Sequence, residues 1–161
     1  IATMITMNGT IEDLKELELT YSPMFSTAKD VVNMAALVAT NILENRFKQI
    51  HVDEVRALVE KDAYILDVRE VGEFANGHIK NAVNIPLSEL RERMNEIPKE
   101  RTVYVHCRSA QRSYNAVMAL LHNGYENVYN VSGSFLGICL YEYFNDQTKN
   151  REPIVTQYNF R

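Results

Sequence analysis

The segment around Cys107 combines a cysteine with the residue types that activate a thiol. It reads HCRSAQRS; a predicted buried strand over residues 102–106 leads into it, and a predicted amphipathic helix over residues 113–122 follows. The backbone N–H groups of a loop that opens a helix form an anion-binding nest, and Arg108 and Arg112 add positive potential. These conditions lower the pKa of a thiol, whose thiolate is the nucleophile. The spacing therefore favours a reactive Cys107 over a small core residue, the commoner role of a free cysteine.

The second cysteine, Cys139, lies in a different setting. Its neighbours Ile138 and Leu140 belong to an apolar helical stretch without nearby positive charge. A free cysteine in such a stretch behaves as a small hydrophobic residue. We therefore expect Cys139 to serve packing.

The elements that must position Cys107 alternate between strands and helices. Short apolar runs predict strands, while Asp53 and Ser88 are candidate caps of two helices that precede the one at residues 113–122. The predicted strands cover residues 63–68, 102–106 and 128–131, and the two further helices cover residues 54–61 and 89–97. Strands separated by helices predict an α/β fold with a parallel sheet, whose active sites lie just past the carboxyl ends of the strands.

Four groups of motifs occur in a fixed order between residues 51 and 145. In chain order they are Asp67-Val68-Arg69-Glu70 with Glu73-Phe74, Gly77-His78-Ile79 with Asn81-Ala82 and Asn84-Ile85-Pro86, Cys107 to Arg112, and Val131-Ser132-Gly133 with Phe135. In this order they resemble the rhodanese family. Ala110 replaces a common loop glycine, Ser134 stands where glycine is usual, and the customary tryptophan is missing. Since alanine resists backbone angles that glycine adopts, these departures bear on loop geometry and rate.

The resemblance implies a rhodanese-like α/β fold, with a parallel sheet flanked by helices, and sulfurtransferase activity. Cys107 then accepts a sulfane sulfur from thiosulfate or a low-molecular-weight persulfide and becomes a cysteine persulfide. The loop backbone cradles this sulfur and the two arginines attract the anionic donor; the loop residues are Arg108, Ser109, Ala110, Gln111 and Arg112. The chemistry requires no metal.

Several charged residues near the motifs favour a structural role. For Asp67, Arg69 and Glu73 we expect a buried ion-pair network that steadies the loop rather than direct catalysis. His78 and His106 are expected to be structural, because a thiolate that its loop has already ionised needs no base.

The first part of the chain carries a second resemblance. Asp30 can cap a helix to about Asn45 that is apolar on more than one side, which predicts an interface or core helix. The stretch from Leu17 to Asp30, with Asn33-Met34-Ala35, resembles the end of the dimerisation domain of coenzyme A disulfide reductases and related flavin-dependent NADH oxidases. Some members of that family carry a carboxyl-terminal rhodanese domain. The expected organisation is a dimerisation-domain remnant (1–45), a linker (46–50), a rhodanese domain (51–146) and a carboxyl-terminal arm (147–161).

This second resemblance implies that the chain is a fragment of a flavoprotein that reduces coenzyme A disulfides or persulfides with NADH. FAD, NADH and coenzyme A are implied for that parent, whose flavoprotein domains would precede Ile1. The chain contains no glycine-rich dinucleotide fingerprint, so no cofactor site is assigned to it. A homodimer through the N-terminal segment is implied, with Tyr21 either facing the neighbouring subunit's disulfide site or packed in the interface.

The composition indicates which partners are excluded and which cellular compartment is favoured. The 161 residues are 46% hydrophobic and 24% charged, as in folded globular proteins. The net charge of −4 on interspersed charges argues against nucleic acid and an anionic membrane surface as partners, and leaves small-molecule sulfur donors and acceptors. Two cysteines and no leader-like segment favour the cytoplasm, and the longest apolar run, around residues 35–39, is too short to span a membrane.

Two other functions remain open at this point. Cysteine phosphatases place a cysteine and an arginine on a similar loop, but with five intervening residues, whereas four separate Cys107 from Arg112. A tighter loop suits a sulfur atom better than a tetrahedral phosphoryl group. The second alternative is a non-catalytic binding or dimerisation module, for which the departures at Ala110 and Ser134 are the only support.

Overall fold

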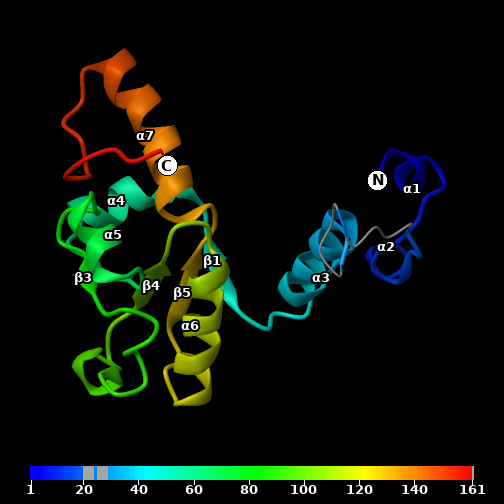
Figure 1. The fold of residues 1–161 in the computed structure, drawn as a ribbon, viewed down its shortest axis with the longest axis horizontal. Coiled ribbons are helices and arrows are strands. Elements are labelled where there is room, and N and C mark those ends of the chain that lie inside the picture. Colours follow the sequence, from blue (N-terminus) through cyan, green and yellow to red (C-terminus); the bar gives the residue numbers. More distant parts are fainter. Residues whose placement is uncertain (20–23, 25–28, 161) are drawn as a thin grey trace. The chain divides into compact units, whose positions relative to one another are not determined.

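The computed structural model describes residues 1–19, 24 and 29–160, which form two compact units. The first unit is Ile1–Arg46 and the second is Phe47–Arg161 (Figure 1). Tyr21, for which the sequence suggested an interface role, lies outside the described residues. None of the helices in the described ranges is both long and apolar enough to cross a membrane.

The N-terminal unit contains three described helices, α1 (Ala2–Thr6), α2 (Ile11–Glu16) and α3 (Val31–Leu43). The predicted cap of α3 is confirmed, because the Asp30 carboxylate accepts a hydrogen bond from the Val32 N–H at 2.8 Å. The Asn33 amide donates to the carbonyls of Lys15 and Leu17, at 3.2 and 3.0 Å, and so ties α3 to the end of α2.

The C-terminal unit is built on a five-stranded sheet in the order β1-β5-β4-β2-β3, in which all neighbours pair in parallel. The strands are β1 (Lys48–Ile50), β2 (Tyr64–Asp67), β3 (Val83–Asn84), β4 (Val103–His106) and β5 (Val128–Val131). Asp67 is in register with His106, so the carboxyl ends of the central strands β2 and β4 coincide. The predicted α/β class with a parallel sheet is confirmed, and Cys107 follows directly after β4.

Helices and two hydrophobic clusters cover both faces of this sheet. Successive strand residues point to opposite faces of the sheet. Leu66 therefore belongs to the cluster that includes α6 (Gln111–His122), and Ile65 belongs to the cluster that includes α7 (Ser134–Lys149). The helical segments are η1 (Val52–Glu54), α4 (Val55–Glu60), α5 (Val71–Ala75), η2 (Met94–Glu96), α6 (Gln111–His122) and α7 (Ser134–Lys149). The layers place the start of α6 beside the end of β4 (Figure 1).

The connector predicted over residues 46–50 is wrong in part, because Lys48–Ile50 forms the edge strand β1 and pairs with β5. Phe47 already belongs to the core, where its ring meets Tyr114 edge-on at 5.1 Å between centroids. A three-residue strand is too short to show a periodic pattern, so periodicity could not predict it.

Two predicted helices also differ from the structure. Residues 89–97 form turns and the short η2, and the Tyr125 hydroxyl lies 2.6 and 3.2 Å from the carbonyls of Met94 and Ile97. The helix predicted from residue 54 begins as η1, where the Glu54 carboxylate accepts from the His51 N–H at 2.8 Å. Neither Ser88 nor Asp53 therefore acts as a helix cap.

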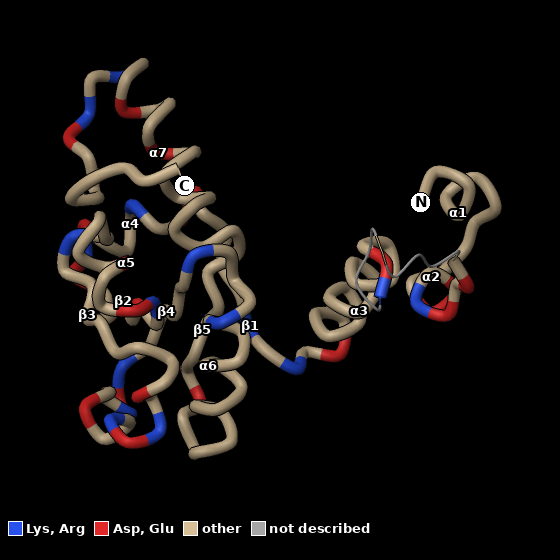
Figure 2. The backbone as a smooth tube through the Cα atoms, in the orientation of Figure 1, with Lys and Arg blue, Asp and Glu red and all other residues tan. Residues whose placement is uncertain are grey.

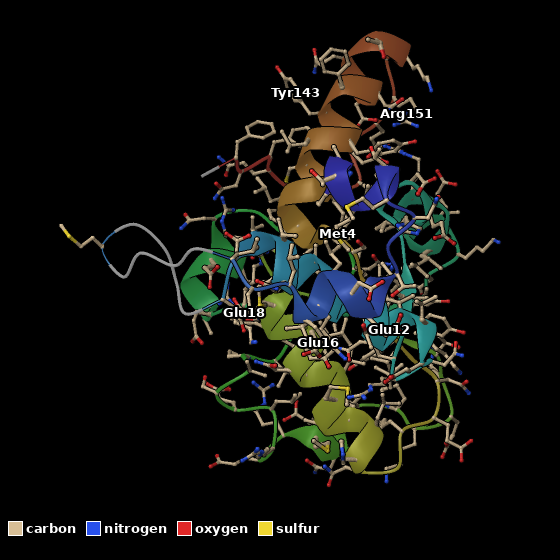
Figure 3. All side chains as sticks on the ribbon, turned by 90° about the vertical axis from the view of Figure 1, so that its right-hand side faces the viewer. Met4, Glu12, Glu16, Glu18, Tyr143 and Arg151 are labelled. Carbon is tan, nitrogen blue, oxygen red and sulfur yellow. The ribbon has the colours of Figure 1, made fainter. Side chains whose placement is uncertain are left out.

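The segment after α7 returns along the molecule and contacts the region that follows α5. Lys80 N–H donates to the Ile154 carbonyl at 2.8 Å, and Thr156 N–H donates to the His78 carbonyl at 2.9 Å. A cluster of polar and charged side chains links the same segment to α4 and α7; its members are Arg56, Glu142, Asp146, Arg151 and Tyr158. Figure 3 labels Arg151, which follows the end of α7. The described part of the predicted arm, from residue 151 to residue 160, thus contacts the rest of the unit.

The closest approach in this packing requires a glycine. Gly77 has a φ of +121°, and a Cβ atom there would collide with the backbone carbonyl of Gln157. The Gly77 carbonyl also accepts a hydrogen bond at 2.8 Å from Arg69, a buried residue beneath the cysteine loop.

We predict that Gly77→Ala destabilises the C-terminal unit by roughly 1–3 kcal/mol, from backbone strain and the collision. The matched control is Gly72→Ala in α5, where a Cβ atom meets no atom within 4 Å. That change should stabilise the unit by about 0.5–1 kcal/mol, because alanine loses less backbone entropy in a helix. Urea unfolding midpoints measure both effects. Equal shifts for the two variants would contradict the role of Gly77.

Candidate active site

The backbone around Cys107 is fixed by the elements on either side of it. The carbonyls of Cys107 and Arg108 accept hydrogen bonds from the N–H groups of Phe135 and Leu136, in the first turn of α7, at 3.0 and 3.1 Å. Ala110 is the N-cap of α6 with a φ of 74°. Because the loop carbonyls are held by α7, the N–H groups of the loop and of the first turn of α6 are free to turn toward the sulfur.

The Cys107 thiol is nearly removed from solvent, with 1% of the residue exposed. Burial alone raises its pKa, but hydrogen bonds from the N–H and hydroxyl of Ser113, the N–H of Ser109 and the hydroxyl of Ser134 outweigh that effect. The net result is a Cys107 pKa below the ordinary thiol value. Such donors favour the thiolate, and they would equally favour a persulfide anion.

Ser134 is a site residue whose role the sequence did not reveal. Its hydroxyl accepts from the Cys107 N–H at 3.2 Å, and its single proton has two acceptors in reach, the Val131 carbonyl at 3.2 Å and the Cys107 sulfur at 4.0 Å. The Ser113 hydroxyl lies 3.4 Å from it, and both serines are fully buried. The sequence marked Ser134 only as a departure from the usual glycine, and its φ of 48° explains why glycine is common at this position.

Arg112 and Glu73 form an ion pair at the edge of the site. Two guanidinium nitrogens of Arg112 donate to the two carboxylate oxygens of Glu73 at 2.6 and 2.8 Å. Arg112 also interacts electrostatically with the Cys107 sulfur, and both anions raise its pKa. Within the described part of the chain, Arg108 has no ion-pair partner. Of the other loop residues, Ser109 and Gln111 are exposed.

The three predicted support residues belong to two different ion pairs, Asp67–Arg69 and Glu73–Arg112. Asp67 and Arg69 form a buried pair, with nitrogen–oxygen distances of 2.6–3.0 Å. The Arg69 guanidinium lies over the Phe135 ring at 4.0 Å, which holds this pair against the start of α7. Glu73 belongs instead to Arg112, so it contacts the active loop directly.

The two histidines near the motifs occupy structural positions. His106 is fully buried, and burial together with Arg69 lowers its pKa despite the opposing effect of Asp67, whose carboxylate lies 3.6 Å away. His78 stacks on the Phe74 ring at 3.9 Å between centroids and contacts the Phe74 carbonyl at 2.9 Å.

Cys139 lies in the core on α7, in agreement with the prediction that it serves packing. The expected absence of nearby positive charge is wrong, because Arg69 and Arg108 both act on its thiol. Burial outweighs them and raises the pKa, so the thiol stays protonated near neutral pH. Among the described residues, no group of three or more His, Cys, Asp or Glu side chains could hold a metal ion.

Comparison with known proteins agrees with this geometry. A sulfurtransferase from Allochromatium vinosum is 40% identical over 76 residues, 47% of this chain and 71% of that protein. The structure of reduced Bacillus anthracis CoADR-RHD matches 83% of this chain, with a TM-score of 0.79 and 42% identity. A NAD-dependent persulfide reductase from A. fulgidus matches the same share, with a TM-score of 0.73 and 38% identity. This chain spans 24% of the length of each of these two structures.

The family model of the rhodanese-like domain matches residues 51–140, more than half of the chain. These residues include the strands β2 to β5, the loop from Cys107 to Arg112 and the first turn of α7. The chain therefore belongs to the rhodanese-like domain family.

Proposed function

We propose that the C-terminal unit is a sulfurtransferase that carries a sulfane sulfur on Cys107 as a persulfide. The observation that carries this proposal is the set of hydrogen-bond donors that lower the pKa of a thiol that is 1% exposed. A buried thiol whose donors do not outweigh its burial stays protonated, as expected for Cys139, whose pKa burial raises. The relative that is named a sulfurtransferase supports the same chemistry.

The reaction proceeds in two displacements at sulfur. The Cys107 thiolate attacks the outer sulfur of thiosulfate, a new sulfur–sulfur bond forms, and sulfite leaves with the electron pair of the broken bond. With a low-molecular-weight persulfide as donor, the leaving group is the corresponding thiolate. A nucleophilic acceptor then attacks the terminal sulfur of the cysteine persulfide and restores the thiolate. In this proposal Arg108, the residue after Cys107 in the loop, attracts the anionic donor.

Phosphate ester hydrolysis is the weaker alternative. The four residues between Cys107 and Arg112 enclose a smaller space than the five of the phosphatase signature. The slight exposure of Cys107 suits attack on a single protruding sulfur atom better than on a tetrahedral phosphoryl group, which must contact donors around its equator.

The alternative of a non-catalytic module rested on Ala110 and Ser134. Both residues adopt left-handed backbone angles, with φ of 74° and 48°, so neither substitution has displaced the turn that a glycine would make. The Ser134 hydroxyl even adds a contact to the sulfur. These observations favour a working site.

We further propose that the parent protein is a homodimeric cytoplasmic flavoprotein that reduces coenzyme A disulfides or persulfides with FAD and NADH. The matches to CoADR-RHD and to the NAD-dependent persulfide reductase support this proposal, because they cover 83% of the chain and thus extend beyond residues 51–140. Residues 1–45 would then end the dimerisation domain. The exposed apolar side chains of α3, among them Val31 and Leu43, suit an interface.

Incubation with thiosulfate should add one sulfur atom to the mass of the protein, and cyanide should remove it as thiocyanate. Cys107→Ala should abolish both, because the nucleophile is lost. Cys139→Ala is the matched control and should retain them. Hydrolysis of an aryl phosphate without any sulfur uptake would reverse the assignment.

The two thiols should differ in the pH dependence of alkylation. Because the Cys107 pKa is lowered, its thiolate persists below the ordinary thiol pKa, and its rate should fall only as the pH drops through the lowered value. Cys139 should react slowly until the protein unfolds, since its pKa is raised. Peptide mapping after iodoacetamide pulses measures both; equal rates near neutral pH would contradict the site.

Ser134→Ala should raise the Cys107 pKa, because a donor to the thiolate is lost. At neutral pH the alkylation of Cys107 in this variant should slow by roughly three- to tenfold, since a pKa rise of up to one unit lowers the thiolate fraction up to tenfold. Ser134→Gly removes the same hydroxyl but relieves the backbone at φ 48°. It should therefore give the same pKa with higher stability. If the Cys107 pKa in the glycine variant equalled that of the wild-type protein, backbone strain and not the hydroxyl would govern the thiol.

A further inference from the structure

We propose that Glu73 determines donor specificity by compensating the charge of Arg112, and thereby selects singly charged sulfur donors over doubly charged ones. This inference rests on the proposed sulfur transfer and concerns the same site. The sequence suggested two arginines that attract an anionic donor. The structure leaves that task mainly to Arg108, because Arg112 already has an anionic partner.

The ion pair is held in a defined geometry on both sides. Glu73 receives two hydrogen bonds from Arg112, and its Oε2 atom also accepts from the Glu70 N–H at 3.2 Å, at the start of α5. The pairing with Arg112 lowers the pKa of Glu73, so the carboxylate is charged near neutral pH. Both side chains are 33% exposed, and Arg112 also interacts with the Cys107 sulfur, so the pair lies between the site and solvent.

Counting the charges shows why the donor's own charge matters. The Cys107 thiolate and Glu73 carry two negative charges, and Arg112 and Arg108 carry two positive ones. The buried Asp67–Arg69 pair adds no net charge, and His106 is neutral because burial lowers its pKa. The site thus offers an approaching anion little net attraction. The Coulomb energy is proportional to the product of the charges, so the repulsion from Glu73 is twice as large for a dianion as for a monoanion.

Thiosulfate and methanethiosulfonate are matched probes for this effect. The two donors have similar shapes, but a methyl group in methanethiosulfonate replaces one charged oxygen, so it carries one negative charge and thiosulfate two. In both cases the thiolate attacks the outer sulfur, and sulfite or methanesulfinate leaves with the electron pair of the broken bond. The ratio of the two kcat/KM values is therefore compared between the wild-type protein and a variant. The different leaving groups cancel in this comparison, and the effect of the donor's charge remains.

The test is Glu73→Gln, which removes the charge at nearly unchanged shape. Its single amide oxygen can still accept from one Arg112 nitrogen and from the Glu70 N–H, while the second hydrogen bond from Arg112 is lost. At low ionic strength, kcat/KM should rise about threefold with methanethiosulfonate and about tenfold with thiosulfate. The repulsion energy that is removed is twice as large for the dianion, and doubling an energy squares the rate factor. The gain should shrink in added salt, which screens partly exposed charges. Glu73→Ala should shift the donor ratio in the same direction.

Glu70→Gln is the matched control, since it removes a carboxylate from the same end of α5 that has no contact with Arg112. It should leave the ratio of the two donors within about twofold. An equal change with both donors, or an unchanged ratio in Glu73→Gln, would overturn the inference while sulfur transfer stands. If wild-type protein gained no sulfur from either donor by intact mass, the proposed function itself would fail, and the inference with it.

Discussion

A sulfur anion held almost completely out of water is the constraint on which the site depends. Removing a charge from water is costly, and the cost falls only when hydrogen-bond donors replace the lost solvent. Cys107 obtains its donors from the loop, from the first turn of α6 and from Ser134 at the start of α7. The sheet, both helices and the turns between them must therefore meet at one point.

This requirement explains the unusual backbone around the sulfur. The carbonyls of the loop point away and are bound by α7, so that the N–H groups on the opposite side can face Cys107. Reversing the chain in so few residues requires left-handed angles, which Ala110 and Ser134 supply at a cost in strain. Charges are balanced around the site in the same way, by the ion pairs Asp67–Arg69 and Glu73–Arg112. Over the described residues, basic and acidic positions are interspersed along the backbone (Figure 2).

Sequence patterns predicted the parts of this arrangement that are local in the chain. The strand before Cys107 and the helix after it, the parallel sheet and the inert environment of Cys139 all follow from periodicity and neighbouring residues. Contacts between distant segments left no such pattern. The pairing of Glu73 with Arg112, the Ser134 hydroxyl beside the sulfur and the edge strand β1 depend on tertiary packing.

The packing of the segment after α7 has a consequence for the order in which the domain assembles during synthesis. Glu142 and Asp146 are buried acids on α7, and Arg151 is one of their two arginine partners. A ribosome makes Arg151 only after both acids, and Tyr158 later still. Until these residues have emerged from the exit tunnel, Arg56 alone must neutralise two carboxylates that the native fold buries. The last turns of α7 therefore settle late, and a nascent chain halted at residue 150 would carry a complete cysteine loop on an unfinished domain.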